Sequence, residues 1–290
     1  MALARQARYL APSGQRNSPE AIMPSFICTT CGVGYVETDA PHDVCLICAD
    51  ERQYVNAAGQ DWTTLDALRA DHVNELRSLE PGLTGIGSHP QIAIGQRALL
   101  IERPDGGVMW DCTPLITDAA LEAIAAKGGV AGIAVSHPHF YATMVDWSRA
   151  LGGVPIWLHE DNRDWVMRPD PAIRYWRGET QEIVPGITLI RTGGHFPGST
   201  VLHWADGAGG KGALLTGDSI MVVPDTRWVS FMYSYPNLIP LNARALERIL
   251  AAIKPFAYDR LYAGWWNRVL DSDGREAVRR SAERYLQAIR

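Results

Sequence analysis

The sequence predicts an α/β (α+β) fold with a small N-terminal appendage, and three observations predict it. Short apolar runs of strand length recur along the chain, and segments with the apolar spacing of amphipathic helices lie between them. Two Cys-x2-Cys pairs precede this alternating region. With 290 residues, 47% of them hydrophobic, the chain can bury a large core, so we expect one large domain and an appendage.

The N-terminal region is predicted to begin with an extension and a cysteine-rich unit. Residues 1–24 are rich in Pro, Ser, Gly and Asn, which predicts a flexible extension, and Met23 is an alternative start of the protein. Residues 25–56 contain the four paired cysteines and predict a metal-bound knuckle. Residues 57–84 are then predicted to be a linking helix, with its helical pattern over 63–79.

The main domain is expected to span residues 85–290. Apolar runs predict strands, and the spacing of apolar residues between them predicts helices. The predicted strands lie near 92–101, 130–135, 155–158, 187–190, 201–204 and 213–215, and the predicted helices lie near 118–127, 143–151, 242–253 and 275–288.

The cysteine motif predicts a tetrahedral metal site. Cys28 and Cys31 form one Cys-x2-Cys pair, and Cys45 and Cys48 form a second pair after thirteen intervening residues. Four thiolates at this spacing can enclose one ion, which would supply much of the folding free energy of so short a segment. The pattern resembles a zinc ribbon or a rubredoxin-like knuckle, and structural zinc is favoured over iron. Two disulfides are the alternative.

Disulfides would require an oxidising compartment, and the sequence favours the cytoplasm instead. No charged start followed by an apolar segment precedes the cysteines, and the fifth cysteine, Cys112, is left without a partner. We expect Cys112 to be a small buried apolar residue.

A second group of candidate metal ligands is spread over the main domain. His137 and His139 follow the predicted strand at 130–135, His195 follows the run at 187–190, and Asp218 follows the run at 213–215. Ligand sites in open α/β sheets tend to lie at the carboxyl ends of strands. Imidazoles and a carboxylate brought together there form a ligand set for zinc or iron.

This pattern resembles the metallo-β-lactamase superfamily, with its His-x-His-x-Asp-His motif and later Gly-His and Gly-Asp motifs. The resemblance implies an αββα sandwich, in which two sheets face each other with helices outside. It also implies that His137, His139 and His195 are ligands of one metal and that Asp218 is the carboxylate that bridges two metals in dinuclear members. The motif is degenerate, because Tyr141 and Ala142 replace its Asp and His and 262–266 contain no histidine. A mononuclear centre is therefore expected.

The resemblance implies a metal-dependent hydrolase that uses metal-activated water. Asp218 would then bind the metal or act as a general base. An iron site of two histidines and Asp218 would instead belong to an oxygenase or another redox enzyme of the same fold. A non-catalytic binding protein, in which the metals only hold the fold, is the third hypothesis.

Further residues are predicted to support the site. Asp111 would fix the orientation of a metal-bound imidazole or form a turn. Tyr141 would donate its phenol to a developing oxyanion or fill the vacant second metal site. Aromatic residues near the motifs, and a loop predicted over 231–240, indicate a pocket for a small, partly apolar substrate. The pocket candidates are His159, which could instead cap a loop, and Phe196, Tyr235 and Trp265.

Composition excludes several classes of partner. The net charge is −5, so we expect no nucleic-acid surface, which would need clustered Lys and Arg. No apolar run reaches the roughly 20 residues that cross a bilayer, so we expect no membrane contact and a soluble cytoplasmic protein. The sequence leaves a homodimer open.

Overall fold

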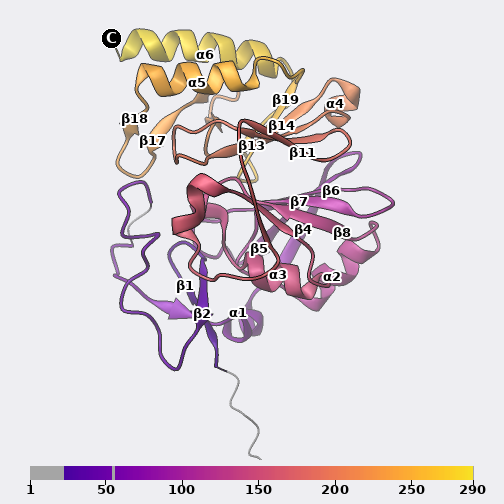
Figure 1. Cartoon of the computed structure of the whole chain (residues 1–290), viewed down its shortest axis with the longest axis vertical. Coiled ribbons are helices and arrows are strands. Elements are labelled where there is room, and N and C mark those ends of the chain that lie inside the picture. The colour runs from indigo at the N-terminus through magenta and orange to yellow at the C-terminus, as the bar shows by residue number, and fades with distance from the viewer. Residues whose placement is uncertain (1–22, 54–55, 290) are drawn as a thin grey trace, which may run out of the picture.

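Two β-sheets face each other and helices cover their outer surfaces, as the computed structural model shows (Figure 1). The structure describes residues 23–53 and 56–289. The αββα sandwich expected from the sequence is confirmed. Most of the predicted N-terminal extension lies outside the described residues.

The first sheet has seven strands in the order β10-β9-β8-β7-β6-β5-β4. Neighbouring strands are antiparallel from β4 to β7 and parallel from β7 to β10. The strands are β4 (Val73–Glu80), β5 (Leu83–His89), β6 (Ala98–Ile101), β7 (Gly107–Trp110), β8 (Val130–Ala134), β9 (Ile156–His159) and β10 (Ile173–Trp176).

The second sheet has six strands in the order β11-β12-β13-β14-β19-β20. All neighbours are antiparallel except β14 and β19, which are parallel. The strands are β11 (Thr180–Val184), β12 (Ile187–Arg191), β13 (Thr200–Trp204), β14 (Ala213–Gly217), β19 (Arg260–Ala263) and β20 (Val269–Leu270).

The inner strands read as nearly continuous apolar runs, because both of their faces are buried. In β14, Leu215 joins the core between the two sheets, whereas Leu214 packs on the opposite side with α5 (Ala243–Ile253) and α6 (Gly274–Ala288). Successive residues of a strand point to opposite faces, so a strand covered on both sides reads as a continuous apolar run. This explains why apolar runs predicted these strands correctly.

The helices lie close to their predicted positions. The helices that lie on the first sheet are α2 (Asp118–Ala125) and α3 (Met144–Ala150). Thr117 caps α2 and Asn242 caps α5, each accepting a hydrogen bond from a backbone N–H of the first turn. The remaining short helices are α4 (Gly207–Gly210) and the 3₁₀ turns η1 (Pro138–Phe140) and η2 (Glu160–Trp165).

The helix predicted over 63–79 is wrong beyond its first two turns. The segment forms α1 (Leu65–Asp71), capped by Thr64, and then strand β4. Leu76 and Leu79 have the spacing of a helix face, but in β4 they pack against different hydrophobic clusters on opposite faces of the sheet. Residues 57–84 are therefore not a linking helix, and the first sheet begins at Val73. Strand β5 was not predicted, and only Ala98–Ile101 of the run at 92–101 is a strand.

The cysteine-rich unit contains the three-stranded sheet β2-β1-β3. Its strands are β1 (Ser25–Cys28), β2 (Gly34–Glu37) and β3 (Trp62–Thr63). The unit is not detached from the main domain, because Gly34 donates its backbone N–H to the carbonyl of Ala142 at 2.9 Å.

The loop predicted over 231–240 is a short hairpin formed by β17 (Met232–Ser234) and β18 (Ile239–Pro240). It follows a second ribbon, β15 (Met221–Val222) with β16 (Val229–Ser230).

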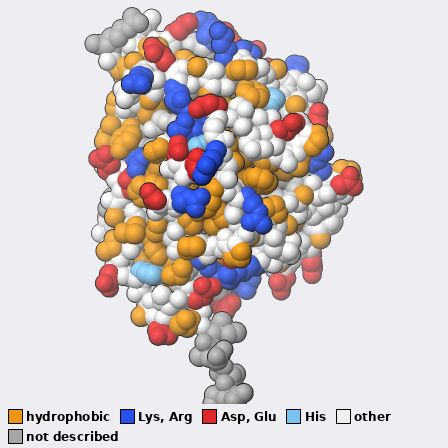
Figure 2. Space-filling view, in the orientation of Figure 1, with side chains coloured by type: hydrophobic (Ala, Val, Ile, Leu, Met, Phe, Trp, Pro, Cys, Tyr) orange, Lys and Arg blue, Asp and Glu red, His pale blue; other side chains and the backbone are white. Residues whose placement is uncertain are grey.

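Acidic, basic and hydrophobic side chains are interspersed on the face drawn in Figure 2, in line with the 27 basic and 32 acidic residues of the chain. Among residues 23–53 and 56–289, no helix is long and apolar enough to cross a membrane.

Candidate metal centres

Three strand ends bring the four predicted ligands of the main domain together. His137 follows β8 and precedes η1, His195 lies in the loop after β12, and Asp218 directly follows β14. Gly217 allows the close approach of these ends, because a Cβ there would lie 2.7 Å from the Ser136 hydroxyl, and its φ of +50° favours glycine.

The ligand atoms form a compact cluster. Asp218 Oδ2 lies 3.3 Å from His137 Nε2, 3.7 Å from His139 Nδ1 and 3.7 Å from His195 Nε2. The distance between His195 Nε2 and His139 Nδ1 is 3.2 Å. All four side chains are buried. A tetrahedral ion with bonds of about 2.0–2.1 Å separates its ligand atoms by about 3.4 Å, so the cluster fits one zinc-sized ion.

Two histidines are oriented by contacts on their other ring nitrogen. His195 Nδ1 lies 2.8 Å from the carbonyl oxygen of Tyr233, which requires a proton on Nδ1 and leaves Nε2 free as a ligand. His137 Nδ1 lies 2.9 Å from the Ser136 hydroxyl. Asp111 accepts the Ser136 backbone N–H at 2.7 Å. Asp111 therefore contacts Ser136, the residue before His137. The predicted role of fixing an imidazole would require a direct contact with a histidine ring, and Asp111 makes no such contact among the described residues.

The protonation states suit metal binding. Burial lowers the pKa of His139 to about 4, and burial also holds the pKa of His195 well below its usual value, so both imidazoles are neutral at neutral pH. Burial opposes ionisation of Asp218, but the nearby imidazoles of His137 and His139 hold its pKa below its usual value. Asp218 Oδ1 is buried and has no hydrogen-bond partner among the described residues. A buried anion beside neutral imidazoles fits a bound cation.

The four knuckle cysteines form a second cluster. The Sγ atoms of Cys28 and Cys48 are 3.6 Å apart, and those of Cys31 and Cys45 are 3.7 Å apart. A disulfide needs about 2.05 Å, and the cysteines are free thiols here. A tetrahedral site with metal–sulfur bonds of about 2.3 Å places its sulfurs about 3.8 Å apart, so this cluster also fits one ion. Cys112 is buried and unpaired, as expected.

The His/Asp cluster opens into a large pocket of about 870 Å³. His139 and Asp218 lie on its wall. Tyr235 and Trp265 line it as predicted, and the Tyr235 hydroxyl also donates to the Asp218 carbonyl at 2.9 Å. Most other lining residues are apolar: Ile94, Met221, Val222, Val223, Pro224, Met232, Pro236, Leu238 and Trp266.

The other two predicted pocket residues do not line the pocket. Phe196 is fully buried behind the cluster, with its ring centre 5.0–5.7 Å from those of the three histidines. His159 caps η2 by accepting the Asp161 backbone N–H at 3.2 Å, and its ring packs against Trp176. The loop-capping alternative predicted for His159 is therefore the one that the structure supports.

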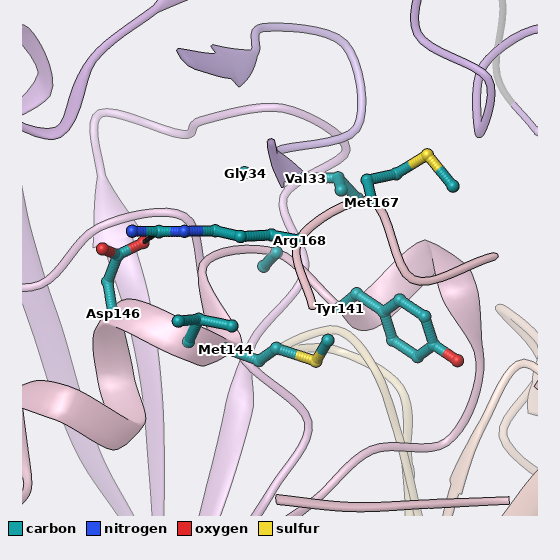
Figure 3. Close-up of a pocket in the computed structure, with 9 residues that line it drawn as sticks. Val33, Gly34, Tyr141, Met144, Asp146, Met167 and Arg168 are labelled. Carbon is teal, nitrogen blue, oxygen red and sulfur yellow. Dashed lines mark hydrogen bonds and ion pairs between the residues drawn. The ribbon is translucent and has the colours of Figure 1, made fainter. Parts of the chain in front are cut away.

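The predicted role of Tyr141 as an oxyanion donor is wrong. Its hydroxyl donates to the Asn162 carbonyl at 3.3 Å, so this proton is not directed at the pocket. Tyr141 borders a separate cavity of about 10 Å³ between the knuckle and the main domain, where its hydroxyl points away from Asp146 and Arg168 (Figure 3). Phe140, the residue after His139, packs its ring against Gly264 and Trp265.

Sequence reasoning missed the knuckle residues that line the pocket. Arg52 and Gln53 come from the segment after the last knuckle cysteine, and Arg268 comes from the turn after β19. No motif marks them, because their position depends on how the knuckle packs on the main domain.

No protein-family profile matches the chain. Solved structures show that the chain has the metallo-β-lactamase fold: the DIM-1 metallo-β-lactamase has a TM-score of 0.56 at 12% identity over 74% of this chain and 98% of its own. FIM-1 from Pseudomonas aeruginosa, in its mono-zinc form, has a TM-score of 0.55 at 13% identity over 74% of this chain and 96% of its own. The chain belongs to the family of the uncharacterized protein YmaE of Bacillus subtilis (strain 168). The two are 48% identical over 269 residues, which cover 92% of this chain and 97% of YmaE.

Proposed function

We propose that the protein is a metal-dependent hydrolase of a small, partly apolar substrate, with one zinc ion held by His137, His139, His195 and Asp218. The observation that carries the proposal is the ligand cluster at the wall of a large pocket. Among the described residues, the other group that could hold a metal is the cysteine cluster, which supports a mononuclear His/Asp centre. FIM-1 gives a precedent for one zinc in this fold.

A zinc ion bound there would lower the pKa of a water to about 7 and polarise a carbonyl or phosphoryl oxygen. The protein contributes the remaining parts of the mechanism. Asp218 Oδ1, which has no hydrogen-bond partner in 23–53 and 56–289, is free to orient a water molecule and accept its proton. Tyr233 holds His195 through Nδ1 and keeps the ligand nitrogen in place.

The pocket lining supports the proposed substrate class. Its walls are largely apolar, and they include two adjacent tryptophans, Trp265 and Trp266. Arg268 lines the pocket and places a positive charge at its wall. We expect a substrate with an apolar body and at most one anionic group.

The test is a hydrolysis screen with the zinc-loaded protein and chromogenic esters, thioesters, lactams and phosphodiesters. We expect hydrolysis of at least one class, and a loss of at least about 100-fold in kcat/KM in His139→Ala. His72→Ala, a histidine outside the pocket, is the matched control and should retain full activity. Equal activity in His139→Ala and the wild type would refute the proposal. Turnover that depends on iron and oxygen instead of zinc would favour the redox alternative.

A further inference from the structure

The segment that follows the last knuckle cysteine contacts the loop that holds His195. Residues 50–53 of the knuckle follow Cys48 and Ala49 and lie beside the hairpin β17–β18 (Figure 1). The segment is folded onto the knuckle turn, because Ala49 donates its N–H to Cys45 at 2.9 Å and Gln53 donates to Asp50 at 3.1 Å.

Arg52 holds the backbone of His195. Its Nη1 donates to the carbonyl oxygen of His195 at 3.2 Å, and its guanidinium lies 3.8 Å from the ring centre of Phe196. Asp50 fixes the guanidinium through two hydrogen bonds, of 2.6 Å to Nε and 2.8 Å to Nη2. Both side chains are largely buried, with 11% and 15% exposed, so this ion pair is shielded from solvent.

Glu51 contacts the hairpin that contains Tyr233, the second residue that positions His195. Its backbone carbonyl accepts the Ser234 hydroxyl at 2.6 Å and the Asn237 amide at 2.7 Å, and its carboxylate accepts the Tyr233 hydroxyl at 2.9 Å. Tyr233 is also the residue whose carbonyl accepts the proton on His195 Nδ1. The knuckle segment therefore reaches His195 by two routes, through its backbone and through its imidazole.

We propose that Arg52 is a positioning residue of the His/Asp centre, and that metal in the cysteine knuckle raises the affinity of this centre for its own metal. The inference rests on the proposed metal site. An ion at the four cysteines orders the turn from which Asp50, Glu51 and Arg52 extend. Removing groups that orient metal ligands typically weakens metal binding about 10- to 100-fold. The knuckle is then part of the active-site support as well as a folding unit.

The test measures the zinc dissociation constant of the His/Asp centre in the full-length protein with the knuckle zinc-loaded, by competition with a chromophoric chelator. We expect Arg52→Leu to weaken binding about 10- to 100-fold. Arg52→Lys should restore part of the affinity, because it keeps the charge and loses the paired hydrogen bonds to Asp50. The matched control is Arg284→Leu, which removes a guanidinium 3.7 Å from a tryptophan ring centre on another part of the surface and should leave the affinity unchanged.

A second arm tests the coupling to the knuckle. Cys28→Ser/Cys31→Ser should weaken zinc binding at the His/Asp centre to a similar extent, and adding Arg52→Leu should cause little further loss because both changes act through one segment. The absorption spectrum of Co²⁺ at the His/Asp centre gives a readout that is independent of activity, and we expect it to change in Arg52→Leu.

The outcomes separate this inference from the proposed function. Affinity within twofold of the wild type in Arg52→Leu would overturn the inference and leave the metal site intact. Absence of zinc binding at the His/Asp centre of the wild type would overturn both. If thermal unfolding shows that Arg52→Leu does not fold, the zinc affinities of Arg52→Lys and Asp50→Asn are compared with that of the wild type instead. Affinity within twofold of the wild type in both variants would overturn the inference.

Discussion

At the scale of single residues, one close contact fixes the ring of Phe140 beside His137. Phe140 is fully buried and its ring packs against Gly264, where a Cβ would lie 2.3 Å from the end of the ring. The departures from the superfamily motif at Tyr141 and Ala142 could be read from the sequence. The packing of Phe140 against Gly264 could not, because these residues are 124 positions apart and meet only in the folded chain.

Gly264→Ala tests this packing. The added methyl group must displace Phe140 in a filled core, and such overpacking typically costs about 1–3 kcal/mol. We expect the free energy of unfolding in urea to fall by that amount. Gly132→Ala provides a comparison, since the nearest atoms to a Cβ built there lie at 3.5–3.6 Å, which is ordinary van der Waals contact. Unchanged stability in Gly264→Ala would show that this contact is not tight.

Asp111 is predicted to make stability depend on pH. Burial raises its pKa to about 8, and the N–H of Ser136 opposes this only in part. An unfolded Asp has a pKa of about 3.9, so between about pH 4 and pH 8 the folded protein binds the extra proton and stability falls as pH rises. Asp111→Asn keeps an acceptor for Ser136 and should reduce this dependence. Urea unfolding from pH 5 to 9 measures it, and parallel pH profiles of both proteins would contradict the assignment.

At the scale of elements, strands that read as continuous apolar runs could be predicted, whereas the edge strand β4 and the glycine-containing strand β5 could not. Strand β14 reads as an apolar run, because both faces of this strand are covered. Strand β4 is half exposed, and its two leucines have helical spacing, so the sequence favoured a helix. Pairing of β4 with β5 along its whole length decides the outcome, and this long-range interaction leaves no local signal.

We expect the knuckle to be the element whose stability depends most on a bound metal. Three short strands and few apolar residues give it little core of its own, so we expect the bound ion to supply much of its stability. Removal of metal with a strong chelator should make residues 25–63 sensitive to limited proteolysis while the sandwich stays resistant. Mass spectrometry of the fragments locates the cuts. Equal protection with and without metal would mean that the fold of the knuckle does not need an ion.

At the scale of the whole molecule, the sequence predicted the sandwich and both ligand groups, but not their arrangement relative to each other. The ligand groups were predictable because they belong to recognisable patterns, the two Cys-x2-Cys pairs and the His and Asp motifs that resemble those of the metallo-β-lactamase superfamily. The contact between the knuckle segment and the His195 loop joins residues 143 positions apart, from Arg52 to His195. Such a contact depends on how two finished units pack, which spacing along the chain does not encode.

The central claim is that His137, His139, His195 and Asp218 hold one metal ion while the cysteines hold another. Elemental analysis of protein purified without added metal and without air tests it most directly, with His137→Ala/His139→Ala measured beside the wild type. We predict about two ions per chain in the wild type and about one in the variant, one ion for each ligand cluster. The same metal content in both proteins would contradict the account, because the His/Asp cluster would then hold no ion.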